Sequence, residues 1–369
     1  MSSNTRRRAL INTDAKNEAD DQFAIVHALL SPTIDTRGLI AAHFGTRRSQ
    51  QSMLDSRAEI DLLQEMLGHA APVTNGAPHA IGEPGTSVGE ARPVDSHGAR
   101  MIIEEAHRDG EGQGTLYVAF LGPLTDMASA LLLDPSIQDT DTVVIWIGGH
   151  HYYDPIYPRQ HKVEFNLAND IAAANVVMAS RLPVWQVPSS VYRQVSVGYA
   201  ELEGRVAPHG RIGRYLVDQL HAWNAKYHAG PIEHRSLGDS PAIGLIMNPQ
   251  SAHFSSRPAP VFAEDGMTAG CTRGRVRCSS RSPMTPGGCL RTCSTSSRST
   301  RRAPSARSLL DDAGGAQSTH SAQVWTILAG MNCHSGPCLI VAIATMRCKV
   351  DSNSLRKVRS MRAIYCVFR

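Results

Sequence analysis

Acidic side chains crowd into a short segment near the start of the chain. They are Asp14, Glu18, Asp20 and Asp21, and they follow the short apolar stretch at residues 9–11. Like charges at this spacing repel each other, so a folded protein tolerates them when a cation or hydrogen-bond donors neutralise them. Hard oxygen ligands on a loop favour Ca²⁺, or Mg²⁺ where fewer ligands converge. The alternative is a solvated acidic loop in which Asp20 or Asp21 caps the helix that follows.

Polar residues at three later positions offer further chemistry. Glu164 and Asn166 lie two residues apart, so on an extended segment they share one face, either a solvent edge or the wall of a site. Their place after a strand and before a helix favours the wall. Asp239 precedes Pro241, where proline suits the first turn of a helix, so Asp239 fits a helix cap, a metal ligand or both.

The elements that must position these residues alternate along the chain. Apolar strands are expected at residues 9–11, 38–42, 115–121, 142–147 and 183–187, and helical periodicity separates them. Continuous apolar strands alternating with helices predict an α/β fold with an open, mostly parallel, Rossmann-like sheet covered by helices on both faces. Ligands in such folds bind outside the carboxyl ends of the strands. The loops after residues 11, 42, 121 and 147 are therefore the expected site loops.

Six segments, in order, resemble the motifs of the inosine-uridine preferring nucleoside hydrolases. Residues 12–14 with 20–21 look like the N-terminal Asp-x-Asp…Asp-Asp signature, and residues 38–45 look like the second strand and its glycine turn. Residues 121–128 resemble the Gly-x-Leu-Thr-Asn-x-Ala turn, and residues 147–149 the Met-Gly-Gly strand end. Residues 164–166 with 170 match the Glu-Phe-Asn motif, and residues 238–242 match the late His-Asp-Pro segment. The resemblance spans roughly residues 9–265.

The resemblance implies a Ca²⁺ site and a ribose site. The implied Ca²⁺ ligands are Asp14, Asp21, Asp239 and the backbone carbonyl of Leu121. Asp20 is implied to hydrogen-bond the ribose hydroxyls, and Glu164 and Asn166 to hold the remaining sugar hydroxyls. The implied activity is Ca²⁺-dependent hydrolysis of the N-glycosidic bond of ribonucleosides or a related ribosyl compound, in which Asp14 activates a metal-bound water.

This chemistry has a physical basis. Cleavage of an N-ribosidic bond develops oxocarbenium character at the anomeric carbon, so the site needs negative charge near the sugar, a water and a base. A carboxylate-held Ca²⁺ can bind the water and the ribose diol together and lower the pKa of the water. Charged hydrogen bonds from Asp20 to the diol are stronger than neutral ones.

The sequence departs from the family pattern at several positions. The interval from Asp14 to Asp20 is two residues longer than usual, Asn12 replaces the first aspartate, and Thr46 stands where an asparagine is usual. Gly238 stands where purine-preferring members carry a histidine that protonates the leaving base, a role typically worth ~10²–10⁴-fold in rate. Residues that could replace it are His150, His151, Tyr152, His221, Trp223, Tyr227 and His234. Packing or surface roles are the alternative for each.

The sequence changes character at about residue 267. Lys and Arg number 21 against 30 Asp and Glu through residue 270 but 16 against 3 afterwards, and all eight cysteines lie beyond residue 270. Loss of periodicity and abrupt Arg, Ser and Cys enrichment favour a frameshift or unspliced-intron product. A genuine basic tail with nucleic-acid affinity is the alternative. We therefore expect a nucleoside hydrolase-like domain at residues 1–266 and a low-order, irregular segment at 267–369.

The composition also bears on compartment and partners. The N-terminus is polar and arginine-bearing, with no apolar signal region, and the cysteines form no paired Cys-x-x-Cys ladder. These features favour a reduced, cytoplasmic environment. No apolar run reaches membrane-spanning length, so a membrane partner is not expected. A small-molecule substrate is expected, nucleic acid is disfavoured, and the resemblance favours a homo-oligomer.

Competing functions remain open at this stage. A catalytically weak or inactive homologue that binds a ribosyl or other sugar ligand is motivated by Gly238 and by the irregular C-terminal segment. A nucleic-acid interaction protein would use the basic tail. A phosphoryl-transfer enzyme would need a lysine near the acidic loop, and Lys16 is the only candidate there.

Overall fold

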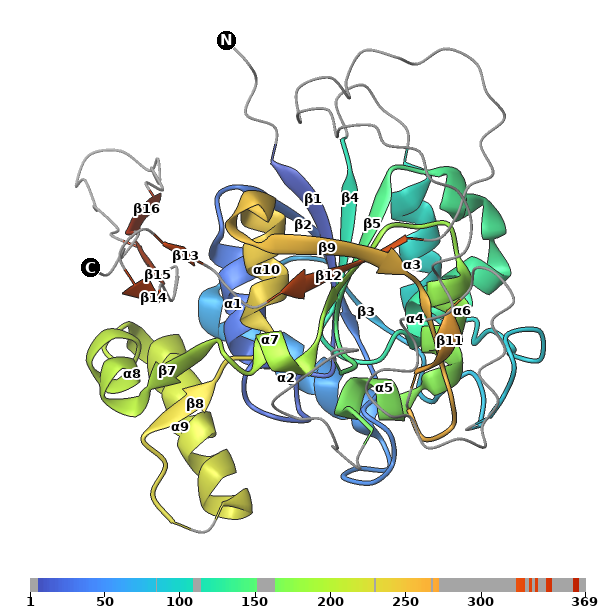
Figure 1. Ribbon diagram of the computed structural model, residues 1–369. Helices are drawn as coiled ribbons and strands as arrows, with labels where there is room; N and C mark the ends of the chain where they lie inside the picture. The colour runs from blue at the N-terminus through green and yellow to red at the C-terminus, as the bar shows by residue number, and fades with distance from the viewer. Residues whose placement is uncertain are drawn as a thin grey trace, which may run out of the picture.

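The computed structural model describes residues 6–83, 85–108, 114–150, 163–228, 230–266 and 268–271, together with the backbone of five later strands. Its centre is an eight-stranded sheet in the order β3-β2-β1-β4-β5-β6-β12-β9 (Figure 1). The six strands from β3 to β6 run parallel. They are β1 (Arg7–Thr13), β2 (Ile34–Ala41), β3 (Val73–Asn75), β4 (Leu116–Phe120), β5 (Thr142–Ile147) and β6 (Val184–Val187). The predicted open parallel sheet is confirmed.

Helices cover both faces of this sheet, as its continuous apolar strands require. Alternate side chains of β1 enter different cores: Ile11 packs in one and Leu10 in the other. The first core lies under α1 (Asp21–Leu30), α2 (Ser52–Leu67), α8 (Tyr199–Arg205), α9 (Gly210–Tyr227) and α10 (Ser240–Met247). The second lies under α3 (His97–Ala106), α4 (Thr125–Leu133) and α6 (Ile171–Ala179). Because the helices cover the two faces of the sheet, a site is expected in the loops at the carboxyl ends of the parallel strands.

Shorter elements complete the described chain. The helices are α5 (Phe165–Asn169), α7 (Ser189–Tyr192) and the 3₁₀ turns η1 (Pro135–Asp139) and η2 (Pro249–Ser251). The strands are β7 (Ser196–Gly198), β8 (His234–Ser236), β9 (His253–Pro258), β10 (Pro260–Phe262) and β11 (Thr268–Cys271). β7 pairs with β8 in a small two-stranded sheet, which projects from the central sheet together with α8 and α9 (Figure 1). Within the described residues, every helix is too short or too polar to span a bilayer.

The expected domain boundary at residue 266 falls before a strand of the central sheet. β12 (Gln323–Leu328) pairs parallel with β6 and antiparallel with β9, so this part of the chain's last third contributes backbone to the main fold. The remaining strands form two-stranded pairs: β13 (Asn332–Cys333) with β14 (Gly336–Pro337), and β15 (Ile343–Met346) with β16 (Met361–Ile364). The expected low order of the rest of residues 267–369 concerns positions outside the described residues and stays a prediction.

Candidate active site

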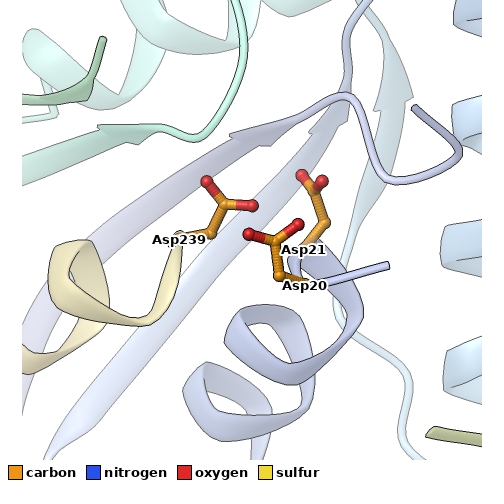
Figure 2. Close-up of side chains that lie close together, drawn as sticks. All are labelled: Asp20, Asp21 and Asp239. Atoms are coloured by element: carbon orange, nitrogen blue, oxygen red, sulfur yellow. The ribbon is translucent and has the colours of Figure 1, made fainter. Parts of the chain in front are cut away.

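Three carboxylates meet where two helices begin. Asp20 and Asp21 lie at the start of α1, and Asp239 lies just before α10, so residues far apart in sequence face each other (Figure 2). One oxygen from each carboxylate lies within 4.8 Å of the others. Asp21 and Asp239 are 2% and 6% exposed. Because carboxylate oxygens are hard ligands, this cluster can hold a divalent cation.

None of these carboxylates is used to cap its helix. Asp20 and Asp239 stand at the N-cap positions of α1 and α10, but neither side chain makes a capping hydrogen bond. Asp20 Oδ2 instead accepts a hydrogen bond from the backbone nitrogen of Gly238 at 2.8 Å. Asp21 Oδ1 accepts one from Thr13 Oγ1 at 2.5 Å. The reading of Asp20 and Asp239 as side-chain caps is therefore wrong, and their oxygens are directed toward the cluster and the residues around it.

Asp14 lies beside this cluster, at the carboxyl end of β1. Its side chain is 1% exposed, and its Oδ2 has no hydrogen-bond partner among the described residues. A Cβ built on Gly122 would lie 2.9 Å from Asp14 Cγ, so the Leu121–Gly122 turn passes directly against this carboxylate. Glycine at 122 is needed for that approach. Asp14 is not in the group whose oxygens all lie within 4.8 Å, which contains Asp20 instead.

Burial and the charges of neighbouring acids raise the pKa of Asp14, Asp20, Asp21 and Asp239. Desolvation is the largest cause in each case, followed by the charge of Asp21 for Asp14, of Glu18 for Asp20 and of Asp20 for Asp239. The pKa of Asp20 rises to about 7 and that of Asp21 to about 6, while those of Asp14 and Asp239 rise well above their usual value. Such a cluster is unfavourable when ionised unless a cation compensates it. Asp14 Oδ2, which has no hydrogen-bond partner among the described residues, also needs a partner, so these residues can hold a divalent cation.

Glu18, the remaining acid of the loop, is neutralised in another way. It accepts a hydrogen bond from Arg235 Nη2 at 2.6 Å, and Arg48 Nη2 lies 3.9 Å from its second oxygen. These arginines place a positive charge on the outer side of the loop, while the aspartates turn inward.

Asn166 joins the ends of two central strands. Its Nδ2 donates to the backbone carbonyl of Leu121 at 2.6 Å and to that of Ile147 at 2.8 Å. The Leu121 carbonyl, which the resemblance assigns to Ca²⁺, is thus held by Asn166 beside the Gly122 turn. The structure places Asn166 between the carboxyl ends of β4 and β5, with 8% of its surface exposed.

Glu164 lies at the start of a helix, and the expectation of an extended segment at 164–166 is wrong. Its Oε2 accepts hydrogen bonds from the backbone nitrogens of Gly149 at 2.7 Å and Leu167 at 3.1 Å, so Glu164 caps α5. Capping starts the helix at Phe165 because the carboxylate satisfies a first-turn N–H. Both Glu164 and Asn166 are buried, which excludes the solvent-edge alternative. Glu164 Oε1 accepts a hydrogen bond from Tyr192 Oη at 3.0 Å.

Asn12, which stands where the family pattern has an aspartate, is hydrogen-bonded to a residue on a distant segment of the chain. Asn12 Nδ2 donates to Asp126 Oδ2 at 2.8 Å, and both side chains are fully buried or nearly so. In the pattern that the sequence resembles, an aspartate stands at position 12 and an asparagine at position 126. This chain therefore has the two residue types exchanged, and it keeps a hydrogen bond between an amide and a carboxylate.

The residues considered as replacements for the leaving-group acid lie in different surroundings in the structure. His221 is on the surface, bonded to Glu203 at 3.1 Å and stacked on Tyr199, and His234 is exposed. His150 bonds Ser189 through Nδ1 at 2.7 Å. His151 and Tyr152 lie outside the described residues. Thr46, the other departure, is exposed.

Trp223 and Tyr227, the two aromatic candidates, lie on α9 and belong to an aromatic cluster around Arg48. The Arg48 guanidinium carbon lies 4.9 Å from the Phe165 ring centre, 5.0 Å from that of Trp223 and 5.8 Å from that of Tyr227. Arg48 Nη1 also donates to the backbone carbonyl of Asn17 at 2.8 Å and to the Asn17 side chain. Arg48 thus joins the acidic loop, α5 and α9.

Sequence reasoning missed Tyr192 and Arg48. A signal existed for Tyr192, because it follows the strand expected at 183–187, and the loop after that strand also lies at the carboxyl edge of the sheet. No comparable signal marks Arg48, whose partners come from segments far apart in the chain.

Comparison with known proteins gives a consistent family. The model of the inosine-uridine preferring nucleoside hydrolases matches residues 9–324. A probable uridine nucleosidase 2 of Arabidopsis thaliana is 25% identical over 295 residues, covering 74% of this chain and 86% of the relative. The pyrimidine-specific ribonucleoside hydrolase RihB of Escherichia coli is 22% identical over 295 residues, covering 74% and 87%.

Solved structures share the fold at low sequence identity. A plant nucleoside hydrolase superposes with a TM-score of 0.59 at 17% identity, covering 88% of this chain and 94% of its own. A purine-preferring ribonucleoside hydrolase from Gardnerella vaginalis gives 0.56 at 20% identity, covering 71% and 87%. The family model spans most of the chain and the sheet is the one these structures share. The chain therefore belongs to the inosine-uridine preferring nucleoside hydrolase family and is a hydrolase acting on N-ribosyl compounds.

Proposed function

We propose that this protein catalyses Ca²⁺-dependent hydrolysis of the N-glycosidic bond of ribonucleosides or a related ribosyl compound, with Asp14 as the general base. One observation carries the proposal. Asp14 presents a buried carboxylate oxygen without a hydrogen-bond partner among the described residues, next to the cluster of Asp20, Asp21 and Asp239. A buried polar atom left without a partner is costly, so its presence favours a ligand that completes it.

The proposed Ca²⁺ ligands are the side chains of Asp14, Asp21 and Asp239 and the Leu121 carbonyl. When bound, Ca²⁺ supplies a Lewis acid that makes water more acidic and orients a sugar diol. Burial is the largest cause of the raised pKa values of these carboxyls, and the charges of neighbouring acids add to it. Both effects support a ligand role, because a dication stabilises the ionised forms. Because one oxygen of Asp20 lies within 4.8 Å of oxygens of Asp21 and Asp239, Asp20 can also serve as a metal ligand.

Asp14 acts on the attacking water. Its carboxylate takes a proton from the water, the water oxygen forms a bond to the anomeric carbon, and the bonding electrons of the N-glycosidic bond leave with the base. The departing nucleobase takes a proton from solvent water, the proton held by Asp14 returns to solvent, and the products are free ribose and the free nucleobase. Asp14 Oδ2, which has no hydrogen-bond partner among the described residues, is the oxygen that would accept this proton.

Asp20, Glu164 and Asn166 bind the sugar in this proposal. Asp20 uses Oδ1, because its Oδ2 is already bonded to Gly238. Glu164 uses Oε1, because Oε2 is committed to two backbone nitrogens. Asn166 uses its side-chain oxygen, because its nitrogen is bonded to two carbonyls. Each residue thus keeps one oxygen for a ribose hydroxyl while its other polar atom fixes its orientation.

Ribose release from a panel of nucleosides tests the proposal. Uridine heads the panel because curated relatives carry the names uridine nucleosidase and pyrimidine-specific ribonucleoside hydrolase. We expect the full chain to release ribose with Ca²⁺, to lose this activity with a chelator and to regain it when Ca²⁺ is restored. Ribose binding without any turnover would reject hydrolysis and support a sugar-binding homologue. Full activity in Asp14→Ala would reject the assigned base.

A further inference from the structure

Tyr192 lies where the two halves of the proposed ribose site meet. It is the last residue of α7, which follows β6, so it stands at the same sheet edge as the acidic loop and the Leu121 turn. Its ring packs against the first hydrophobic core. The family motifs found in the sequence do not include position 192, and no role for this tyrosine follows from them.

Two contacts connect Tyr192 to residues that the proposed function uses. Its hydroxyl donates to Glu164 Oε1 at 3.0 Å. Its ring approaches Gly238, since a Cβ built at 238 would lie 3.0 Å from Tyr192 Cδ2. The nitrogen of Gly238 in turn bonds Asp20 Oδ2 at 2.8 Å. A continuous path therefore runs from Glu164 through Tyr192 and Gly238 to Asp20.

The space beside Gly238 is already taken. The same Cβ would lie 3.1 Å from Asp20 Oδ2, so a side chain at 238 would require the Tyr192 ring and the Asp20 carboxylate to shift by a few tenths of an ångström. Both contacts are tighter than ordinary van der Waals distances. Glycine at 238 fits between the Tyr192 ring and the Asp20 carboxylate without such a shift.

The hydrogen bond to Glu164 has a specific geometric effect. Glu164 Oε2 is held by two backbone nitrogens, so Oε1 is the oxygen that can turn toward a sugar. A phenolic donor at 3.0 Å fixes Oε1 and leaves it lone-pair capacity for a sugar hydroxyl. Hydrogen bonds to a charged acceptor are stronger than neutral ones, so this contact favours one orientation of Glu164.

We propose that Tyr192 is a positioning residue of the ribose site, which holds Glu164 Oε1 toward the sugar through the hydrogen bond from its hydroxyl. This inference rests on the proposed function because it assumes that Glu164 binds the sugar. A purely structural role for Tyr192 would leave ribose affinity unchanged, whereas the positioning role predicts that ribose affinity depends on the tyrosine hydroxyl.

Tyr192→Phe tests this role because it removes the hydroxyl and keeps the ring. We expect KM for uridine and Kd for ribose, measured by calorimetry, to rise about tenfold, as for the loss of one hydrogen bond to a charged group. The kcat value should change by less than about threefold, as for lost binding that the ground and transition states share. In the Glu164→Gln background the same change should have little further effect, because the two groups act as a pair.

Tyr215→Phe is the matched control. Tyr215 also donates to a glutamate, Glu59 Oε1 at 2.6 Å, but on α9 and α2 outside the proposed site. It should lower Tm without raising KM or the ribose Kd. If Tyr192→Phe behaves like this control, or if its effect adds fully to that of Glu164→Gln, the inference is overturned.

The two proposals fail separately. If the wild-type chain binds ribose but hydrolyses no nucleoside, the proposed function fails, and a tenfold weaker ribose Kd in Tyr192→Phe still supports the positioning role. If hydrolysis is present and Tyr192→Phe leaves KM and ribose affinity unchanged, the positioning role alone is rejected.

Discussion

Asp20 Oδ2 accepts a hydrogen bond from the backbone nitrogen of Gly238 at 2.8 Å, which ties the residue before α1 to the residue before the N-cap of α10. The acidic loop between Asp14 and Asp20 is longer than the family interval. This bond nevertheless fixes its end against α10, where Asp239 lies. The cluster of carboxylates thus depends on contacts between the two helix starts, and its chemistry can be tested residue by residue.

Replacing Asp14 with asparagine should abolish the base while keeping an oxygen ligand. We expect kcat for uridine to fall by about 10²–10⁴-fold, since this is the usual value of general base catalysis. Calorimetric Ca²⁺ binding should persist, because the amide oxygen can still coordinate. Asp61→Asn is a suitable control, since Asp61 is exposed and pairs with Arg57 on α2. Wild-type kcat in Asp14→Asn would show that another group activates the water.

Removing divalent cations should make stability depend on pH in a defined direction. The pKa values of Asp20 and Asp21 rise to about 7 and about 6 in the folded chain, from an ordinary value of 3.8. Because the folded state holds these protons more tightly than the unfolded state, their contribution is fully present below pH 3.8 and is lost as pH rises through 6 and 7. Chelated protein should therefore lose Tm between about pH 4 and pH 7.

Ca²⁺ should reverse this loss. It competes with protons for the same oxygens, so its stabilisation should grow across the same pH range, reaching about 2.7 kcal/mol at a hundredfold excess over Kd. Asp239→Asn should reduce both the pH dependence and the Ca²⁺ effect by removing one carboxylate. A pH-independent Tm in the chelated protein would contradict the burial of ionisable carboxyls at this position.

Replacing Arg48 with methionine should loosen the contact between the acidic loop and α9. The guanidinium packs on Phe165 and Trp223 and donates to the Asn17 carbonyl, so its loss removes cation–π contacts and a hydrogen bond together. We expect a loss of about 1–3 kcal/mol in the free energy of unfolding. Hydrogen exchange should become faster in residues 14–21 and 220–227.

Arg211→Met provides the control for that experiment. Arg211 is also on α9 and pairs with Glu65, but both side chains are largely exposed, so its loss should have little effect. Equal exchange in the two variants would show that Arg48 does not join the loop to α9.

The sequence predicted the sheet and the polar residues of the site, because apolar strands and clustered carboxylates are local features. The strand expected at 9–11 lies within β1, and α1 follows it after the acidic loop. Asp14, Asp20, Asp21 and Asp239 all lie in one region, as the collinear motifs indicated. Their individual roles stay predictions.

What the sequence could not predict depends on contacts across the fold. Glu164 Oε2 accepts a hydrogen bond from the backbone nitrogen of Gly149, which lies 15 residues earlier, in addition to its local cap of α5. Tyr192 meets Gly238 only because α7 and α10 begin at the same sheet edge. Neither contact follows from spacing along the chain, so these residues needed the three-dimensional arrangement to be found.

The exchange of residue types at Asn12 and Asp126 gives the most stringent test of such a contact. Asp126 accepts hydrogen bonds from Asn12 Nδ2, Ser96 Oγ at 2.6 Å and the Ala77 nitrogen at 2.8 Å, and burial raises its pKa. Asn12→Asp alone would set two buried carboxyls against each other. We expect it to lower the free energy of unfolding by about 3 kcal/mol, since one buried charge loses its donor.

Asn12→Asp combined with Asp126→Asn should recover much of that stability, because the pair again consists of one carboxylate and one amide. Asp126→Asn alone should be destabilising as well, since the amide nitrogen would face either the donors of Ser96 and Ala77 or the Nδ2 donor of Asn12. Chemical denaturation of the wild type, the two single variants and the double variant gives the coupling energy. A value near zero would show that the two positions exchanged independently, whereas a favourable coupling of about 1 kcal/mol or more is the result expected of a compensated pair.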